Sequence, residues 1–124
     1  MSPEQHESKA ERITRAMSKL TEADYELTID AAMLAGTHWL NVAMHRFSLT
    51  ASGEDVMHAE YLSGALRLKA SLVAPGLVQA LDEIEQLRPL YVRGDAPNGE
   101  AAGKRCKELL ETLRNGAKAA RPFK

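Results

Sequence analysis

The feature that most constrains this chain is a stretch, residues 22–48, in which apolar side chains recur at helical spacing around nearly the whole circumference. One series with steps of three or four contains Ile29, Met33, Gly36, Leu40, Ala43 and Phe47. A second series contains Ala31, Leu34, His38, Val42, His45 and Leu49. A surface helix needs a single apolar stripe, so two series predict a central, largely buried helix. Gly36 costs about 1 kcal/mol relative to Ala inside a helix, which indicates a position where a neighbouring helix packs closely.

Shorter amphipathic helices are predicted on either side of this segment. Residues 1–7 are polar and read as a loose lead-in in which His6 is exposed, and apolar residues recur from Ser8 to Leu20. After a turn at residues 50–53, Ser52 and Asp55 resemble a helix cap, which predicts a helix over about 54–72.

The last third of the chain predicts two more helices. The "APG" at 74–76 ends the preceding helix, and the next helix follows it until Pro89 either kinks its last turn or ends it near Leu87. A loop at 93–99 then precedes a last helix over about 100–118. No run alternates between apolar and polar residues in the way that strands do. The sequence therefore predicts the all-α class, as a single-domain up-and-down bundle of four to five helices spanning residues 1–124, with an ordered core of about 8–118.

Composition and charge disfavour several classes of protein. Sixteen basic and seventeen acidic residues nearly cancel, whereas nucleic-acid-binding domains usually carry a positive excess, so we expect no nucleic-acid partner. The single cysteine, Cys106, allows no intramolecular disulfide, and it falls on an apolar stripe that predicts a buried thiol. The polar first residues lack the apolar core of a signal peptide, and no apolar run approaches the roughly 20 residues of a membrane span. We expect a cytoplasmic protein without membrane association.

The histidines are the most reactive side chains in the pattern. His38 and His45 share a helix face but lie roughly 10 Å apart along the axis, so one metal ion does not easily bridge them. The i, i+4 histidine pair of helical zinc sites is absent, although Asp55 or Glu60 could supplement either histidine. The pattern favours hydrogen-bonded histidines in the core or an interface, and we predict no metal and no cofactor.

A ligand pocket is the alternative interpretation of the same residues. His58 either forms a surface ion pair with the neighbouring acids or joins the other two histidines around a cavity. The candidate ligand-binding residues are His38, Trp39, His45, His58, Arg88 and Tyr91. No nucleophile elbow, phosphate loop or Cys/His cluster is present, so we assign no catalytic residue and favour a binding role over an enzyme.

Two segments resemble the HEPN superfamily of small helical-bundle proteins. "IDAAMLAGTHWLNVAMHRFSL" resembles the second helix of that family, and "LDEIEQLRPLYVRGD" resembles its Leu-x-x-Leu-Arg segment. Nuclease members carry an arginine followed shortly by a histidine near a dimer interface. Arg88 matches the arginine, but "PLYVRGDA" supplies no histidine. The resemblance implies a bundle that dimerises and acts as a non-catalytic interaction module, in some members beside a nucleotidyltransferase-type protein.

Three functions follow from these observations. The favoured one is a HEPN-like binding or interaction module that partners a nucleotidyltransferase-type protein. The others are a small-ligand or metal-binding protein that uses His38, His45 and His58, and a degenerate HEPN ribonuclease or toxin. The central helix carries more apolar surface than one neighbour would cover, so a homodimer is also expected.

Overall fold

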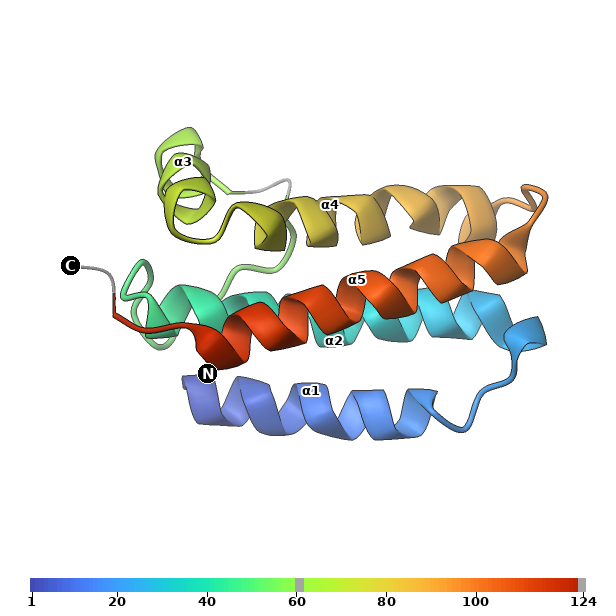
Figure 1. The fold of residues 1–124 in the computed structure, drawn as a ribbon, viewed down its shortest axis with the longest axis horizontal. Helices are drawn as coiled ribbons and strands as arrows, with labels where there is room; N and C mark the ends of the chain where they lie inside the picture. Colours follow the sequence, from blue (N-terminus) through green and yellow to red (C-terminus); the bar gives the residue numbers. More distant parts are fainter. Residues whose placement is uncertain (60–61, 123–124) are drawn as a thin grey trace.

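The computed structural model describes residues 1–59 and 62–122, and it confirms the all-α bundle. Four helices run up and down along one long axis, and a shorter helix crosses them at one end (Figure 1). The long helices are α1 (Pro3–Met17), α2 (Tyr25–Arg46), α4 (Pro75–Arg88) and α5 (Gly99–Ala119), and the crossing helix is α3 (Gly64–Val73). A 3-10 turn, η1 (Glu22–Asp24), precedes α2, and a π-helical turn, η3 (Pro89–Arg93), follows α4. The described part of the chain contains no strand.

Helix α2 is the central element, as its apolar pattern predicts. The side chains of Ile29, Trp39 and Leu40 expose at most 1% of their surface. A Cβ atom added at Gly36 would lie 3.0 Å from a methyl carbon of Leu113 in α5 and 3.3 Å from one of Leu81 in α4. The glycine therefore lets both helices approach α2 closely, which confirms the interpretation of this position.

Helix α1 begins five residues before the predicted start at Ser8, so the expected lead-in at residues 1–7 is wrong. Ser2 Oγ accepts a hydrogen bond from the N–H of Gln5, and the Gln5 side chain accepts one from the N–H of Ser2. With Pro3 in the first turn, these bonds form a capping box that fixes the start of the helix. His6 consequently lies inside the helix with 2% of its surface exposed, and the prediction that it is exposed is also wrong.

The helix predicted over 54–72 is the largest error. Residues 54–58 are irregular, and α3 begins only at Gly64, with Ser63 as its cap. The side chain of Asn41 accepts a hydrogen bond from the N–H of Val56 and donates one to its carbonyl, both at 2.7 Å. Glu85 accepts a hydrogen bond from the N–H of Ala59. Side chains of α2 and α4 thus satisfy backbone groups that a helix would otherwise pair.

The C-terminal half matches the prediction more closely. Helix α4 ends at Arg88, and Pro89 starts the π turn, because proline cannot donate the next helical hydrogen bond. Helix α5 spans Gly99–Ala119, within a residue of the expected range. Across residues 1–59 and 62–122, no helix combines the length and apolarity that crossing a membrane requires.

Candidate metal centre

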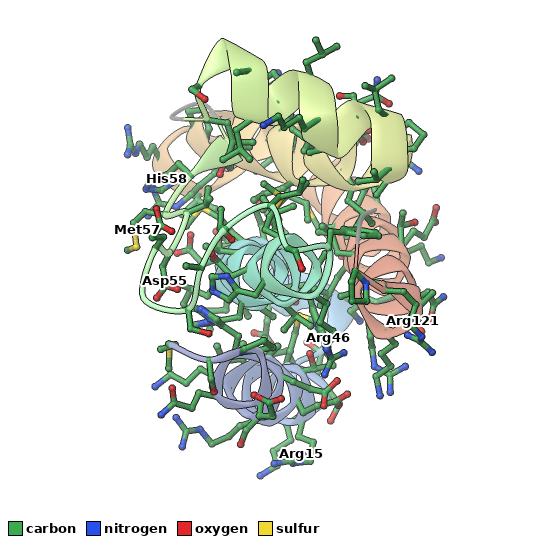
Figure 2. The ribbon with its side chains drawn as sticks, turned by 90° about the vertical axis from the view of Figure 1, so that its left-hand side faces the viewer. Arg15, Arg46, Asp55, Met57, His58 and Arg121 are labelled. Carbon is green, nitrogen blue, oxygen red and sulfur yellow. The ribbon has the colours of Figure 1, made fainter. Side chains whose placement is uncertain are left out.

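Three metal-binding side chains meet at the end of the bundle where α1 begins and α2 ends. His6 comes from α1, His45 from the last turn of α2, and Asp55 from the irregular segment that runs beside α2 (Figure 2). Asp55 Oδ1 lies 2.8 Å from His6 Nε2 and 3.1 Å from His45 Nε2. One ligand atom from each residue lies within 4.8 Å of the other two.

A tight turn after α2 brings these elements together. The N–H of Phe47 bonds to the carbonyl of Ala43, and the N–H of Leu49 bonds to that of Met44. Between them Ser48 adopts the left-handed conformation, with φ of 62°, which ends the helix and reverses the chain. The segment that follows therefore returns past the end of α2 and places Thr50 and Asp55 beside His45.

Each of the two histidines has a second partner on its other ring nitrogen. His45 Nδ1 lies 2.8 Å from Thr50 Oγ1, and His6 Nδ1 lies 2.9 Å from His38 Nδ1. If both imidazoles are neutral, each Nε2–H donates to Asp55 Oδ1 and each Nδ1 is an acceptor. His45 Nδ1 then accepts from the Thr50 hydroxyl, and His6 Nδ1 accepts from His38 Nδ1–H. Both nitrogens of each ring therefore have a partner without an added proton.

The electrostatics favour the neutral form of His6 and His38 and the charged form of the Asp55 carboxylate. Burial lowers the pKa of His6 despite the hydrogen bond to Asp55, and burial together with repulsion from His6 lowers the pKa of His38. Burial alone would raise the pKa of Asp55, but hydrogen bonds from His6, the Met1 amino group and His45 hold that pKa at about 2. At neutral pH these are the protonation states in which imidazoles and carboxylates bind metal ions.

The geometry fits a transition-metal ion. Zinc lies about 2.0–2.2 Å from nitrogen and oxygen ligands, which places tetrahedral ligand atoms roughly 3.3 Å apart. The two Oδ1–Nε2 distances, 2.8 Å and 3.1 Å, are slightly shorter than this spacing, so an ion between these atoms would require them to move apart by a few tenths of an ångström. Two histidines and one carboxylate are also the donor set of catalytic zinc and non-haem iron(II) sites. Once Nε2 binds a metal, each Nδ1–H can donate to Thr50 or to His38, as outer partners of metal-bound histidines do.

An open groove of about 560 Å³ adjoins this cluster. Its lining includes His6, His38, Asp55, Leu34, Met57 and Arg88. Leu34 and Met57 are 52% and 67% exposed, and Figure 2 shows Met57 at the outer edge of the bundle. Arg88 Nε donates a hydrogen bond to Asp30 at 2.6 Å.

The structure brings together only some of the predicted ligand-binding residues. His38 and His45 join one network, with His45 as a candidate ligand and His38 behind His6. His58 lines the groove but lies outside the metal-binding cluster, and its Nδ1 is 3.5 Å from Glu85 Oε1. The sequence predicted that His58 lies near the start of a helix over 54–72, but the structure places it in the irregular segment. Arg88 lines the groove as well.

Three residues of the sequence analysis, Trp39, Tyr91 and Cys106, are absent from the lining of the groove. Trp39 is fully buried and does not line the groove, and its indole N–H has no hydrogen-bond partner among residues 1–59 and 62–122. Tyr91 lies in η3, packed against the core, and is not part of the groove lining. Burial raises the pKa of the Cys106 thiol to about 12, which agrees with a structural cysteine. Glu60, the alternative acidic partner, lies outside the described residues.

Sequence reasoning missed His6 as a ligand because it placed the start of α1 too late. The "SPEQ" at residues 2–5 is the local signal that could have corrected this, since serine, proline and glutamine occupy the positions of a capping box. Starting the helix at Pro3 places His6 four residues before Ala10, on the buried side of α1.

Comparisons with known proteins add no family to this description. No protein-family model matches the chain, and searches of curated proteins and of solved structures find no significant match. The resemblance to the HEPN superfamily therefore stays a prediction.

Proposed function

We propose that this protein binds a divalent transition-metal ion through His6 Nε2, His45 Nε2 and the carboxylate of Asp55. The observation that carries the proposal is the convergence of three ligand atoms from three separate elements, with Asp55 Oδ1 2.8 Å and 3.1 Å from the two Nε2 atoms and one ligand atom of each residue within 4.8 Å of the others. Both histidine side chains are only 2% exposed, so the protein keeps them buried despite the desolvation of their polar atoms.

The outer partners support the same role. Thr50 orients His45, and His38 orients His6, each through a hydrogen bond of less than 3 Å. Such second partners fix the ring orientation and the tautomer of metal-bound histidines. Three protein ligands also leave at least one coordination position for water or another molecule, which is typical of functional rather than purely structural zinc sites.

Metal titration tests the proposal directly. We expect one equivalent of Zn²⁺ by calorimetry, and one equivalent of Co²⁺ that gives the visible absorption of a low-coordinate nitrogen and oxygen site. His6→Gln, His45→Gln and Asp55→Asn should each weaken binding by at least about tenfold. His58→Gln is the matched control, because His58 lines the same groove outside the cluster. Equal affinity in the parent and the three ligand variants would overturn the proposal.

A second candidate, the interaction module, has one observation in its favour. Leu68 and Leu72 of α3 lie one turn apart and are 62% and 71% exposed, on the helix that crosses the end of the bundle (Figure 1). Exposed apolar patches mark contact surfaces, and we propose a homodimer that uses this one. Light scattering should give twice the chain mass of 13.6 kDa and fall to that mass in a Leu68→Ser, Leu72→Ser variant. A monomeric parent at micromolar concentration would contradict it.

A further inference from the structure

We infer that the groove beside the metal centre binds a small monocarboxylate with an apolar body, whose carboxylate occupies an open coordination position of the ion. The inference rests on the proposed metal site and adds the class of molecule that this site takes. Three properties of the groove carry it: the direction in which the ion faces, the charge of the lining, and the chemistry of the wall.

The ion faces the groove because of where its three ligands lie. His6 and Asp55 both line the groove, whereas His45 is absent from the lining and its side chain is 2% exposed. His45 therefore lies on the side of the cluster away from the groove, with Thr50 as its outer partner. An ion held by all three side chains would have its open coordination positions on the groove side.

The charge of the groove favours an anion. Among the described residues of the lining, Asp55 is the only acid, and a divalent ion bound to it leaves a net positive centre. Arg88 and the Met1 amino group add positive charge to the same lining, although Arg88 is paired with Asp30 and the amino group with Asp55. A carboxylate is both an anion and an oxygen ligand, so it matches this end of the groove in charge and in donor type.

The wall favours an apolar body behind that carboxylate. Met33, Leu34, Val56 and Met57 form its apolar part. The hydroxyl and amide side chains of the wall are already paired: the Thr37 hydroxyl donates to the carbonyl of Met33, and the Asn41 amide pairs with Val56 and Thr37. A sugar or polyol would lose hydration here without gaining those partners. The volume, about 560 Å³, suits a small molecule.

A matched ligand series tests the inference on the zinc-loaded protein. The probes are 4-phenylbutyrate, which has both the charge and the apolar body, acetate, which has the charge alone, and 4-phenyl-1-butanol, which has the body alone. We expect 4-phenylbutyrate to bind at least about tenfold more tightly than either, since the apolar body adds buried surface and the carboxylate binds the ion. It should also change the visible spectrum of the Co²⁺-loaded protein, which the alcohol should not.

Two variants of α2 test whether binding depends on the groove or on any exposed leucine of the same helix. Leu34 lines the groove and Leu27 does not, although both are leucines of α2 with 52% and 59% exposure. Leu34→Ser, which adds no charge, should weaken 4-phenylbutyrate binding by at least about tenfold while leaving Zn²⁺ affinity unchanged, and Leu27→Ser should alter neither. Equal binding of acetate and 4-phenylbutyrate, or equal binding to metal-free protein, would overturn the inference and leave the metal site standing. A protein that binds no metal would remove both.

Discussion

The two sides of α2 are held in different ways. One side packs against α4 and α5 by shape, with Gly36 admitting methyl groups of Leu81 and Leu113. The other side faces α1 and the segment at 50–58 through directional bonds from His38, Asn41 and His45. Apolar packing alone suffices to hold a helix in a bundle, and buried polar groups carry a desolvation penalty. We therefore expect a substitution in the apolar packing of the first side to cost more folding free energy than one on the second side, where the proposed metal site lies.

The largest expected effect comes from the apolar side. Leu40→Ala should lower the free energy of unfolding by about 2–5 kcal/mol, because Leu40 is 1% exposed and the close-packed helices around it cannot fully collapse into the space. Urea denaturation monitored by Trp39 fluorescence measures the change. If Leu40→Ala lowers the free energy of unfolding by less than His45→Ala, the apolar side does not contribute more to stability than the polar side.

The second effect concerns His45→Ala on the polar side. Without metal, the loss of the imidazole should lower the free energy of unfolding by about 1–3 kcal/mol, because Asp55 and Thr50 lose a partner. Adding zinc should increase the difference in stability between the parent and the variant. At a free concentration of one hundred times Kd the ion should stabilise the parent by about 2.7 kcal/mol and His45→Ala by far less. Equal stabilisation of both proteins in the same denaturation assay would contradict the assignment of His45 as a ligand.

Acidification should weaken the polar side selectively. The folded-state pKa of His6 and of His38 lies below 6.5, so the unfolded chain binds more protons below that pH, and stability falls as pH drops through this range. Asp55 adds a further loss below about pH 4, as its carboxylate becomes protonated towards its pKa of about 2.

The measurement is metal-free unfolding between pH 7.5 and pH 5.5. Leu40→Ala should lose stability with falling pH as steeply as the parent, whereas His6→Gln should have a shallower dependence. A parent that becomes more stable on acidification would show that the sign is wrong.

The smallest effect is expected at the surface between α1 and α5. Arg114 Nε lies 3.2 Å from Glu11 Oε1, and both side chains are about one-third exposed. Arg114→Gln should therefore lower the free energy of unfolding by only about 0.2–1 kcal/mol, and 1 M salt should reduce that difference. Arg15→Gln, at an exposed position of α1, is the control. A loss comparable to that of His45→Ala would mean that ion pairs, and not the histidine network, hold α1.

The sequence predicted the side of α2 that is built from periodic apolar residues. The helices α2 and α5 and the role of Gly36 followed from spacing, because that pattern is local. For the candidate metal centre, the sequence offered Asp55 as a partner of His45 but missed His6, since positions 6, 45 and 55 form no local motif and meet only through the capping box of α1 and the turn at Ser48. The irregular segment after residue 53 escaped prediction for a similar reason. Its backbone partners, Asn41 and Glu85, come from distant parts of the chain.

The capping box that begins α1 at Pro3 has a consequence for local unfolding. Helix α1 packs mainly along α2, so its detachment is the opening motion that disturbs the rest of the bundle least. Because His6 lies in its first turn, an ion shared with His45 and Asp55 would fasten the starting end of that helix to the bundle. Detachment of α1 would then require release of the ion. Hydrogen exchange of the α1 amides would accordingly slow as the ion binds, while amides protected only by global unfolding would slow equally along the whole chain.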